Sequence, residues 1–247
     1  MDVNLNFPEL REPYATALRE AVAHAFTRTR PIGIVASGTI IRGNPDASSD
    51  IDLYVIHGAP WRQRVQRWFN GVPCEMFINP PRAVEQYFDE ERADGRPHTA
   101  HMLATGFVVL NTSPVVDQLL ERARAIVNEP PNYSAFHTTM TRYGAATLFE
   151  DALDIAERDA ATAAMLLDKA VLAALDLFFI ARNLPVPRNK ELLAVMHTLD
   201  AAAGDAALAY YTLATWPNKF SAASILFNSV IGARGFFEWE SEPQVVA

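Results

Sequence analysis

The feature that most constrains this chain is a pair of aspartates inside a short apolar run, Asp50-Ile51-Asp52-Leu53. Alternating charged and apolar residues predict a β-strand over 50–56, because successive side chains on a strand point to opposite faces. The two carboxylates then project from one face, while the apolar side chains enter a core on the other. We therefore expect a sheet that carries an acidic patch on a largely buried strand.

Two further apolar runs flank the aspartates. The run at 32–36 precedes them and leads into Gly38-Thr39, and the run at 72–78 follows them and contains Glu75. If these runs are neighbouring strands, the three acids form a cage that suits Mg²⁺, which prefers oxygen ligands and keeps positions open for phosphate oxygens. A glycine turn that opens a helix offers backbone N–H groups to phosphate. The pattern predicts metal-dependent chemistry on a nucleoside triphosphate.

The rest of the N-terminal part alternates between helical and strand patterns. Helices are expected over 12–29, over a short segment from Gly38, and over 61–69, 82–94 and 113–127. Strands are expected over 32–36, 50–56 and 72–78, with 105–110 as an edge strand. The helix over 61–69 rests on the spacing of Trp61, Val65 and Trp68. This order predicts a small α/β sheet with helices packed on it.

Beyond Pro130-Pro131, which are typical of a linker, the pattern is helical without a convincing strand. Helices are expected near 134–158, 160–182, 189–202, 204–215 and 219–233, and they predict a bundle. The segment 160–182 is apolar nearly all round, as in a central helix. We therefore expect a catalytic domain over 1–128 and a helical domain over 132–247. The predicted fold class is α+β (α/β) with a small mixed sheet, followed by an all-α helical bundle.

The block Gly38-Thr39-Ile40-Ile41-Arg42-Gly43 … Ser49-Asp50-Ile51-Asp52-Leu53 resembles the signature of the DNA polymerase β-like nucleotidyltransferases. In that superfamily a Gly-Ser pair precedes an Asp-h-Asp-h strand, where h is apolar. The minimal and aminoglycoside-modifying members often have Gly-Ser-x-x-Arg-Gly … Ser-Asp-Ile-Asp-Leu. This chain matches that version with Thr39 in place of Ser, which keeps the hydroxyl. The run Val72 to Phe77 resembles the strand that bears the family's third acid, here Glu75.

The resemblance implies roles for the residues of this block. Asp50 and Asp52 would hold one or two Mg²⁺ (or Mn²⁺) ions that bridge the triphosphate. Glu75 would either ligate a second metal ion or accept the proton of the attacking hydroxyl as a general base. Gly38 and Thr39 would cradle the phosphates through backbone N–H groups and the threonine hydroxyl.

Four further residues are candidates for binding the nucleotide. Ser49 would donate a hydrogen bond to a phosphate or simply stabilise a turn. Arg42 would contact a phosphate, which guanidinium groups bind in bidentate fashion, or pair with an acid and stiffen the turn. In the helical domain, Arg188 and Lys190 are candidates for reaching the triphosphate.

Composition limits the partners and the compartment. A net charge of −8 and a pI near 5.2 argue against a nucleic-acid surface, which needs a basic stripe, and suit a cationic small substrate. The single cysteine, Cys74, excludes an intrachain disulfide framework. The sequence shows neither a secretory signal nor a charge-free apolar stretch for a membrane span. We therefore expect a cytoplasmic protein without membrane or nucleic-acid partners, and the sequence leaves a homodimer open.

The predicted activity is transfer of a nucleoside monophosphate, AMP from ATP, to a hydroxyl of a small molecule with release of pyrophosphate. Catalysis would depend mainly on positioning and electrostatics. The layout of the helical region is similar to the kanamycin nucleotidyltransferase C-terminal domain and to HEPN-like domains. This similarity implies an aminoglycoside-type antibiotic as acceptor and a role in antibiotic resistance. Two alternatives remain: AMP transfer to a protein in a toxin–antitoxin pair, and a nucleotide-binding regulatory module without turnover.

Overall fold

The computed structural model describes residues 4–93, 95–241 and 243, and the chain divides into two compact units, 1–129 and 130–247. The last residue of the helix predicted over 82–94 lies outside the described residues, as do the outermost residues of both predicted domains. Each unit has hydrophobic cores of its own, so each is described by itself.

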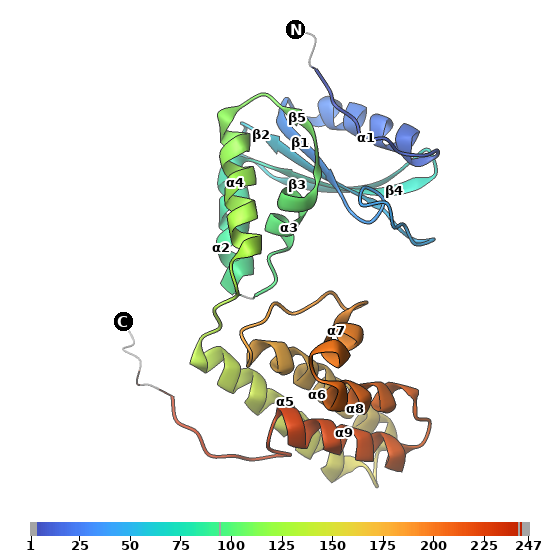
Figure 1. Cartoon of the computed structure of the whole chain (residues 1–247), viewed down its shortest axis with the longest axis vertical. Coiled ribbons are helices and arrows are strands. Elements are labelled where there is room, and N and C mark those ends of the chain that lie inside the picture. The colour runs from blue at the N-terminus through green and yellow to red at the C-terminus, as the bar shows by residue number, and fades with distance from the viewer. Residues whose placement is uncertain (1–3, 94, 242, 244–247) are drawn as a thin grey trace. The chain divides into compact units, whose positions relative to one another are not determined.

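Unit 1 combines strands with four helices in its described part (Figure 1). Its helices are α1 (Tyr14–Arg28), α2 (Pro81–Ala93), α3 (His98–Thr105) and α4 (Pro114–Asn128). Its strands are β1 (Pro31–Ser37), β2 (Ile51–His57), β3 (Gln63–Phe69), β4 (Val72–Asn79) and β5 (Phe107–Asn111). The strand order is β3-β4-β2-β1-β5, with β2 and β4 parallel and the other neighbours antiparallel. This arrangement confirms the predicted small mixed sheet, with β5 at its edge.

The two faces of the sheet are covered by different helices, α1 on one side and α2, α3 and α4 on the other (Figure 1). Ile51, Leu53 and Val55 of β2 are fully buried in the core beneath α1. Tyr54 and Ile56 of the same strand enter the second core. The alternation predicted for this strand is therefore present, and both faces are covered over most of its length.

The segment predicted as a helix over 61–69 forms strand β3 instead, so this prediction is wrong. Asn70 and Gly71 both have positive φ angles, 44° and 75°, and form a two-residue hairpin turn between β3 and β4. Asn-Gly strongly favours such a turn, because both positions require a left-handed backbone. In a segment as short as β3, apolar spacing does not distinguish a helix from a strand. The Asn-Gly turn that follows it is the signal that favours a strand.

Gly38 does not begin a helix, which also differs from the prediction. Residues 39–43 form successive turns with a hydrogen bond from the Arg42 amide to the Gly38 carbonyl, 3.2 Å long. The amide of Asn44 donates to the Thr39 carbonyl at 3.0 Å, and Gly43 has a φ of 85°, so the helical ladder is not continued. The predictions placed no helix over 98–105, where the structure has α3, and the edge strand predicted from 105 begins at Phe107 instead.

In its described part unit 2 contains helices and no strand. They are α5 (Ala135–Ile155), α6 (Ala160–Ile180), α7 (Leu192–Leu199), α8 (Ala201–Thr212) and α9 (Trp216–Val230). This confirms the predicted helical region. Helix α6 packs against α5, α7 and α9, as expected of a central helix, although Met165 and Leu172 on α6 are exposed. None of the helices in the described ranges is long and apolar enough to cross a membrane.

Candidate functional site

Three carboxylates meet at one end of the sheet. Asp52 lies on β2 directly beside Glu75 of the parallel strand β4, and Asp50 stands just before β2. One oxygen atom of each carboxylate lies within 4.8 Å of those of the other two, and all three residues are at least partly exposed. The structure thus brings together the three acids predicted from the sequence, on the edge of a covered sheet face.

The electrostatics of this group favour a bound cation. Burial and, to a lesser extent, the neighbouring charges of Asp50 and Glu75 raise the pKa of Asp52 to about 6, against the opposing effect of Arg42 and Arg64. Three carboxylates that repel one another are stabilised by a divalent cation, and their oxygen atoms are the donors that Mg²⁺ and Mn²⁺ prefer. The acids therefore fit a metal ion of this kind.

Glu75 differs from the two aspartates because side chains of β3 hold it. Its Oε1 accepts hydrogen bonds from Arg64 at 2.6 Å and from Gln66 at 2.7 Å. The hydrogen bond from Arg64 is the main cause of a lowered pKa at Glu75, against an opposing effect of burial. A carboxylate with a lowered pKa is a weak base but a suitable metal ligand.

The turn after β1 lies directly against the aspartates. Gly38 has a φ of 98°, and a Cβ at this position would lie 3.2 Å from the Asp50 carbonyl oxygen and from Asp52 Oδ2. A larger residue would therefore be strained and would crowd the acids. The hydroxyls of Thr39 and Ser49 are hydrogen-bonded at 2.8 Å, and Ser49 Oγ also accepts from the amide of Asp46 at 2.8 Å. This cross-link places both predicted hydroxyls beside the acids, and it fits the turn role that the sequence left open for Ser49.

The remaining predicted residues are Arg42, close enough to act on Asp52 electrostatically, and two cations of unit 2. Arg42 is exposed, and its charge lowers the pKa of Asp52. Lys190 is exposed in the turn before α7 of unit 2, and Arg188 forms an ion pair with Glu191. The contribution of Lys190 to nucleotide binding thus stays a prediction.

Arg64 and Gln66 are site residues that sequence reasoning missed. Both lie on β3, in the segment interpreted as a helix, and only the strand pairing brings Gln66 opposite Glu75. The Asn70-Gly71 turn carries the signal that would have found them, because a hairpin there fixes the register of β3 against β4.

Comparison with known proteins supports the fold. No protein-family model matches the chain, and no curated protein matches it. Among solved structures, a nucleotidyltransferase-like protein from Exiguobacterium sibiricum 255-15 aligns with a TM-score of 0.53 and 12% sequence identity. The alignment covers 87% of this chain and 73% of that chain. The chain therefore shares its fold with that nucleotidyltransferase-like protein, which agrees with the fold that the resemblance of its Asp-Ile-Asp-Leu block implied.

Proposed function

We propose that this protein is a metal-dependent nucleotidyltransferase that transfers AMP from ATP to a hydroxyl group of a small molecule and releases pyrophosphate. The observation that carries the proposal is the group of three carboxylates on β2 and β4, with ligand atoms within 4.8 Å of one another beside the Gly38 turn. The nucleotidyltransferase-like fold supports it.

Asp50, Asp52 and Glu75 would hold Mg²⁺ or Mn²⁺. Such an ion, when bound, stabilises negative charge on phosphate oxygens during the displacement. Of the two roles left open for Glu75, metal ligand is favoured over general base, because the hydrogen bond from Arg64 lowers its pKa.

The Gly38 turn would bind the triphosphate. The absence of a Cβ at Gly38 lets phosphate oxygens approach the backbone N–H groups of the turn. Thr39 and Ser49 hold each other in place and would donate hydroxyl protons to phosphate oxygens when a nucleotide replaces their mutual bond. Arg42 adds positive charge near the acids, and Lys190 of unit 2 remains a candidate for a further phosphate contact.

In the reaction, the acceptor oxygen forms a bond to the α-phosphorus of ATP. The bond between the α-phosphorus and the oxygen that bridges to the β-phosphate breaks, and pyrophosphate leaves with that electron pair. The acceptor's hydroxyl proton passes to solvent. The residues of the chain contribute mainly by positioning the two reactants and by neutralising charge.

The identity of the acceptor rests on the sequence resemblance alone. An aminoglycoside-type antibiotic, a resistance role and a cytoplasmic location all stay predictions, and so does AMP transfer to a protein. Nucleotide binding without turnover, as in a regulatory module, likewise stays a prediction.

The test is to incubate the protein with Mg²⁺, each of four nucleoside triphosphates and a panel of hydroxylated compounds that includes aminoglycosides. Pyrophosphate release is followed, and the masses of the acceptors are measured by mass spectrometry. A gain of one AMP mass that Asp50→Asn abolishes supports the proposal. Glu20→Gln, at an exposed position of α1, is the control. Nucleotide binding without pyrophosphate release across the panel would favour the binding module instead.

A further inference from the structure

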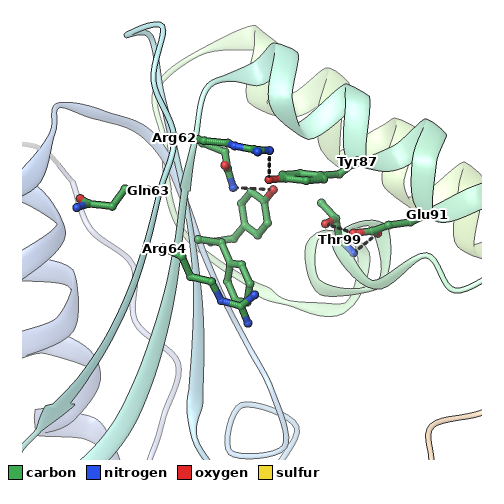
Figure 2. A pocket seen from close by; sticks show the side chains of 9 residues that line it. Arg62, Gln63, Arg64, Tyr87, Glu91 and Thr99 are labelled. Carbon is green, nitrogen blue, oxygen red and sulfur yellow. Dashed lines mark hydrogen bonds between the residues drawn. The ribbon is translucent and has the colours of Figure 1, made fainter.

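A cavity of about 320 Å³ opens in unit 1 between β2, β3 and β4 on one side and α2 and α3 on the other (Figure 2). Its lining combines aromatic rings with charged and amide groups. The lining residues are Tyr54, Arg62, Gln63, Arg64, Phe77, Asn79, Tyr87, Glu91 and Thr99. The volume lies at the lower end of the range of small-molecule sites.

The cavity continues the same sheet face that carries the acids. Tyr54 lies two residues after Asp52 on β2, and Phe77 two residues after Glu75 on β4, so their side chains point to the same face. Arg64 connects the cavity with the acids, because it lines the cavity and donates a hydrogen bond to Glu75. A ligand in the cavity would therefore extend towards the three carboxylates.

The strand register orders the lining along this face. Glu75 lies opposite Gln66 and Phe77 opposite Arg64. Asn79 lies two positions farther along β4, near Arg62, which directly precedes β3. At about 3.3 Å per strand residue, roughly 13 Å separate the level of the acids from the level of Arg62. Figure 2 shows Arg62 beside Tyr87, with Arg64 well apart from them.

The cavity has positive charge to offer a ligand. Arg62 donates to the Tyr87 hydroxyl at 2.6 Å, and the described residues give it no carboxylate partner. The carboxylate of Glu91 is already used, since its oxygens accept from the amide and the hydroxyl of Thr99 at 2.6 and 2.7 Å near the start of α3. The guanidinium of Arg62 is thus the charged group available at the end of the cavity away from the acids.

Between the two ends lie aromatic faces. Tyr54 and Phe77 are stacked, with ring centroids 5.8 Å apart and an interplanar angle of 8°. Arg64 lies over the Phe77 ring at 4.6 Å, and Arg62 near the Tyr87 ring at 5.6 Å. Rings with planar guanidinium groups favour a flat ligand, which they contact over a large area.

We propose that this cavity is the acceptor subsite of the transferase, and that the acceptor is a hydroxyl-bearing compound with a planar ring and an anionic group, a phosphate or a carboxylate. Arg62 binds the anion, the partly exposed rings of Phe77 and Tyr87 contact the ring of the ligand, and the hydroxyl lies towards Glu75 and the aspartates. The proposal rests on the proposed function. It departs from the aminoglycoside expectation, because the guanidinium of Arg62, which has no carboxylate partner among the described residues, attracts an anion and repels a cation.

The first test is binding of four matched probes to the full chain by calorimetry. They are 4-(hydroxymethyl)phenyl phosphate, 4-(hydroxymethyl)benzoate, the neutral 4-methylbenzyl alcohol and the cationic 4-(hydroxymethyl)benzylamine. We expect one or both anions to bind, and the better of the two identifies phosphate or carboxylate. Binding of the amine or the neutral alcohol as tightly as the anions, or no anion binding at millimolar concentration, would overturn the proposal.

Variants of two arginines locate the anion. Arg62→Gln should weaken anion binding about tenfold, the effect of losing a charged hydrogen bond. Arg67→Gln is the matched control, because Arg67 is exposed on β3 but pairs with Cys74, on the opposite face from Arg64. Equal losses in both variants, or none in Arg62→Gln with its fold intact by circular dichroism, would contradict the assignment.

A competition experiment separates this proposal from the proposed function. Anion binding should persist with saturating Mg²⁺ and a non-hydrolysable ATP analogue, and it should survive in Asp50→Asn. Displacement of the anion by the nucleotide would place it in the phosphate site and overturn the subsite. If the anion binds as predicted but no nucleotide binds with Mg²⁺, the proposed function fails while the anion site stands.

Discussion

The two faces of strand β2 have different roles. On one face, Ile51, Leu53 and Val55 are fully buried under α1 and make no polar contact through their side chains. On the other face, Asp52 is partly exposed among acids, Tyr54 lines a cavity, and only Ile56 lies wholly in an apolar core. Because side chains alternate along a strand, the apolar residues that stabilise the fold and the acids that destabilise it point to opposite faces. One pairing register of β2 therefore satisfies both sets.

The acidic face should be where activity is lost. Asp50→Asn should reduce transfer on the order of a thousandfold, because a carboxylate that holds the metal ion is replaced by a neutral amide. Circular dichroism and the thermal midpoint should remain near those of the wild type. Pyrophosphate release is the measurement, and a variant with near-normal rates would show that the acids are not the site.

The apolar face should be where stability is lost. Leu53→Ala should lower the free energy of unfolding by about 3 kcal/mol, the usual cost of a cavity at a fully buried leucine. Urea unfolding followed by tryptophan fluorescence measures it. Val115→Ala on α4, where the side chain is 38% exposed, is the comparison and should cost less than about 1 kcal/mol. Equal losses of unfolding free energy in the two variants would contradict the prediction that the apolar face of β2 stabilises the fold through burial.

Replacing Asp52 should raise the free energy of unfolding, which is a smaller effect than that of Leu53→Ala and opposite in sign. Its pKa is raised to about 6 in the folded protein, so ionised Asp52 destabilises the fold above pH 6, and the penalty fades as the pH falls towards 4. Without metal, Asp52→Asn should stabilise the protein by about 1–2 kcal/mol at pH 7.5 and hardly at all at pH 4.

Thermal unfolding at both pH values tests this prediction. Adding Mn²⁺ should stabilise the wild type more than the variant, since a ligand stabilises the state that binds it. The difference in stability between the two proteins should therefore become smaller. A variant that is less stable than the wild type at pH 7.5 without metal would refute the electrostatic description of the acids.

The smallest effect should come from Arg64. Arg64→Gln removes the cation that competes for Glu75, so Mn²⁺ should bind about twofold to fivefold more tightly, the range of a partly exposed ion pair. Arg67→Gln on the other face is again the control and should leave the affinity unchanged. Weaker Mn²⁺ binding in Arg64→Gln would indicate that Arg64 positions Glu75 instead of competing with the metal.

The sequence predicted the acidic face better than it predicted what surrounds it. The Asp50-Ile51-Asp52-Leu53 alternation determines both the strand and the side on which its carboxylates lie, and the apolar run around Glu75 supplies the third acid. Strand β3 was not predicted, because apolar spacing over 61–69 fits both periods and the Asn70-Gly71 turn alone separates them.

The missing strand had consequences for the site. Arg62, Arg64 and Gln66 reach the acids or the cavity only through the pairing of β3 with β4, a tertiary contact that local pattern does not contain. Helix α3 escaped prediction for a similar reason: its first turn is capped by Glu91 from the preceding helix, eight residues away in sequence from Thr99.

The most direct test of the central claim is calorimetric binding of a non-hydrolysable ATP analogue with and without Mg²⁺, in the wild type, Asp50→Asn and Asp52→Asn. The account predicts that the wild type binds the nucleotide tightly only with Mg²⁺, and that both variants lose this dependence. Nucleotide binding that is indifferent to Mg²⁺, or unchanged in both variants, would contradict the assignment of the three carboxylates as a metal and nucleotide site.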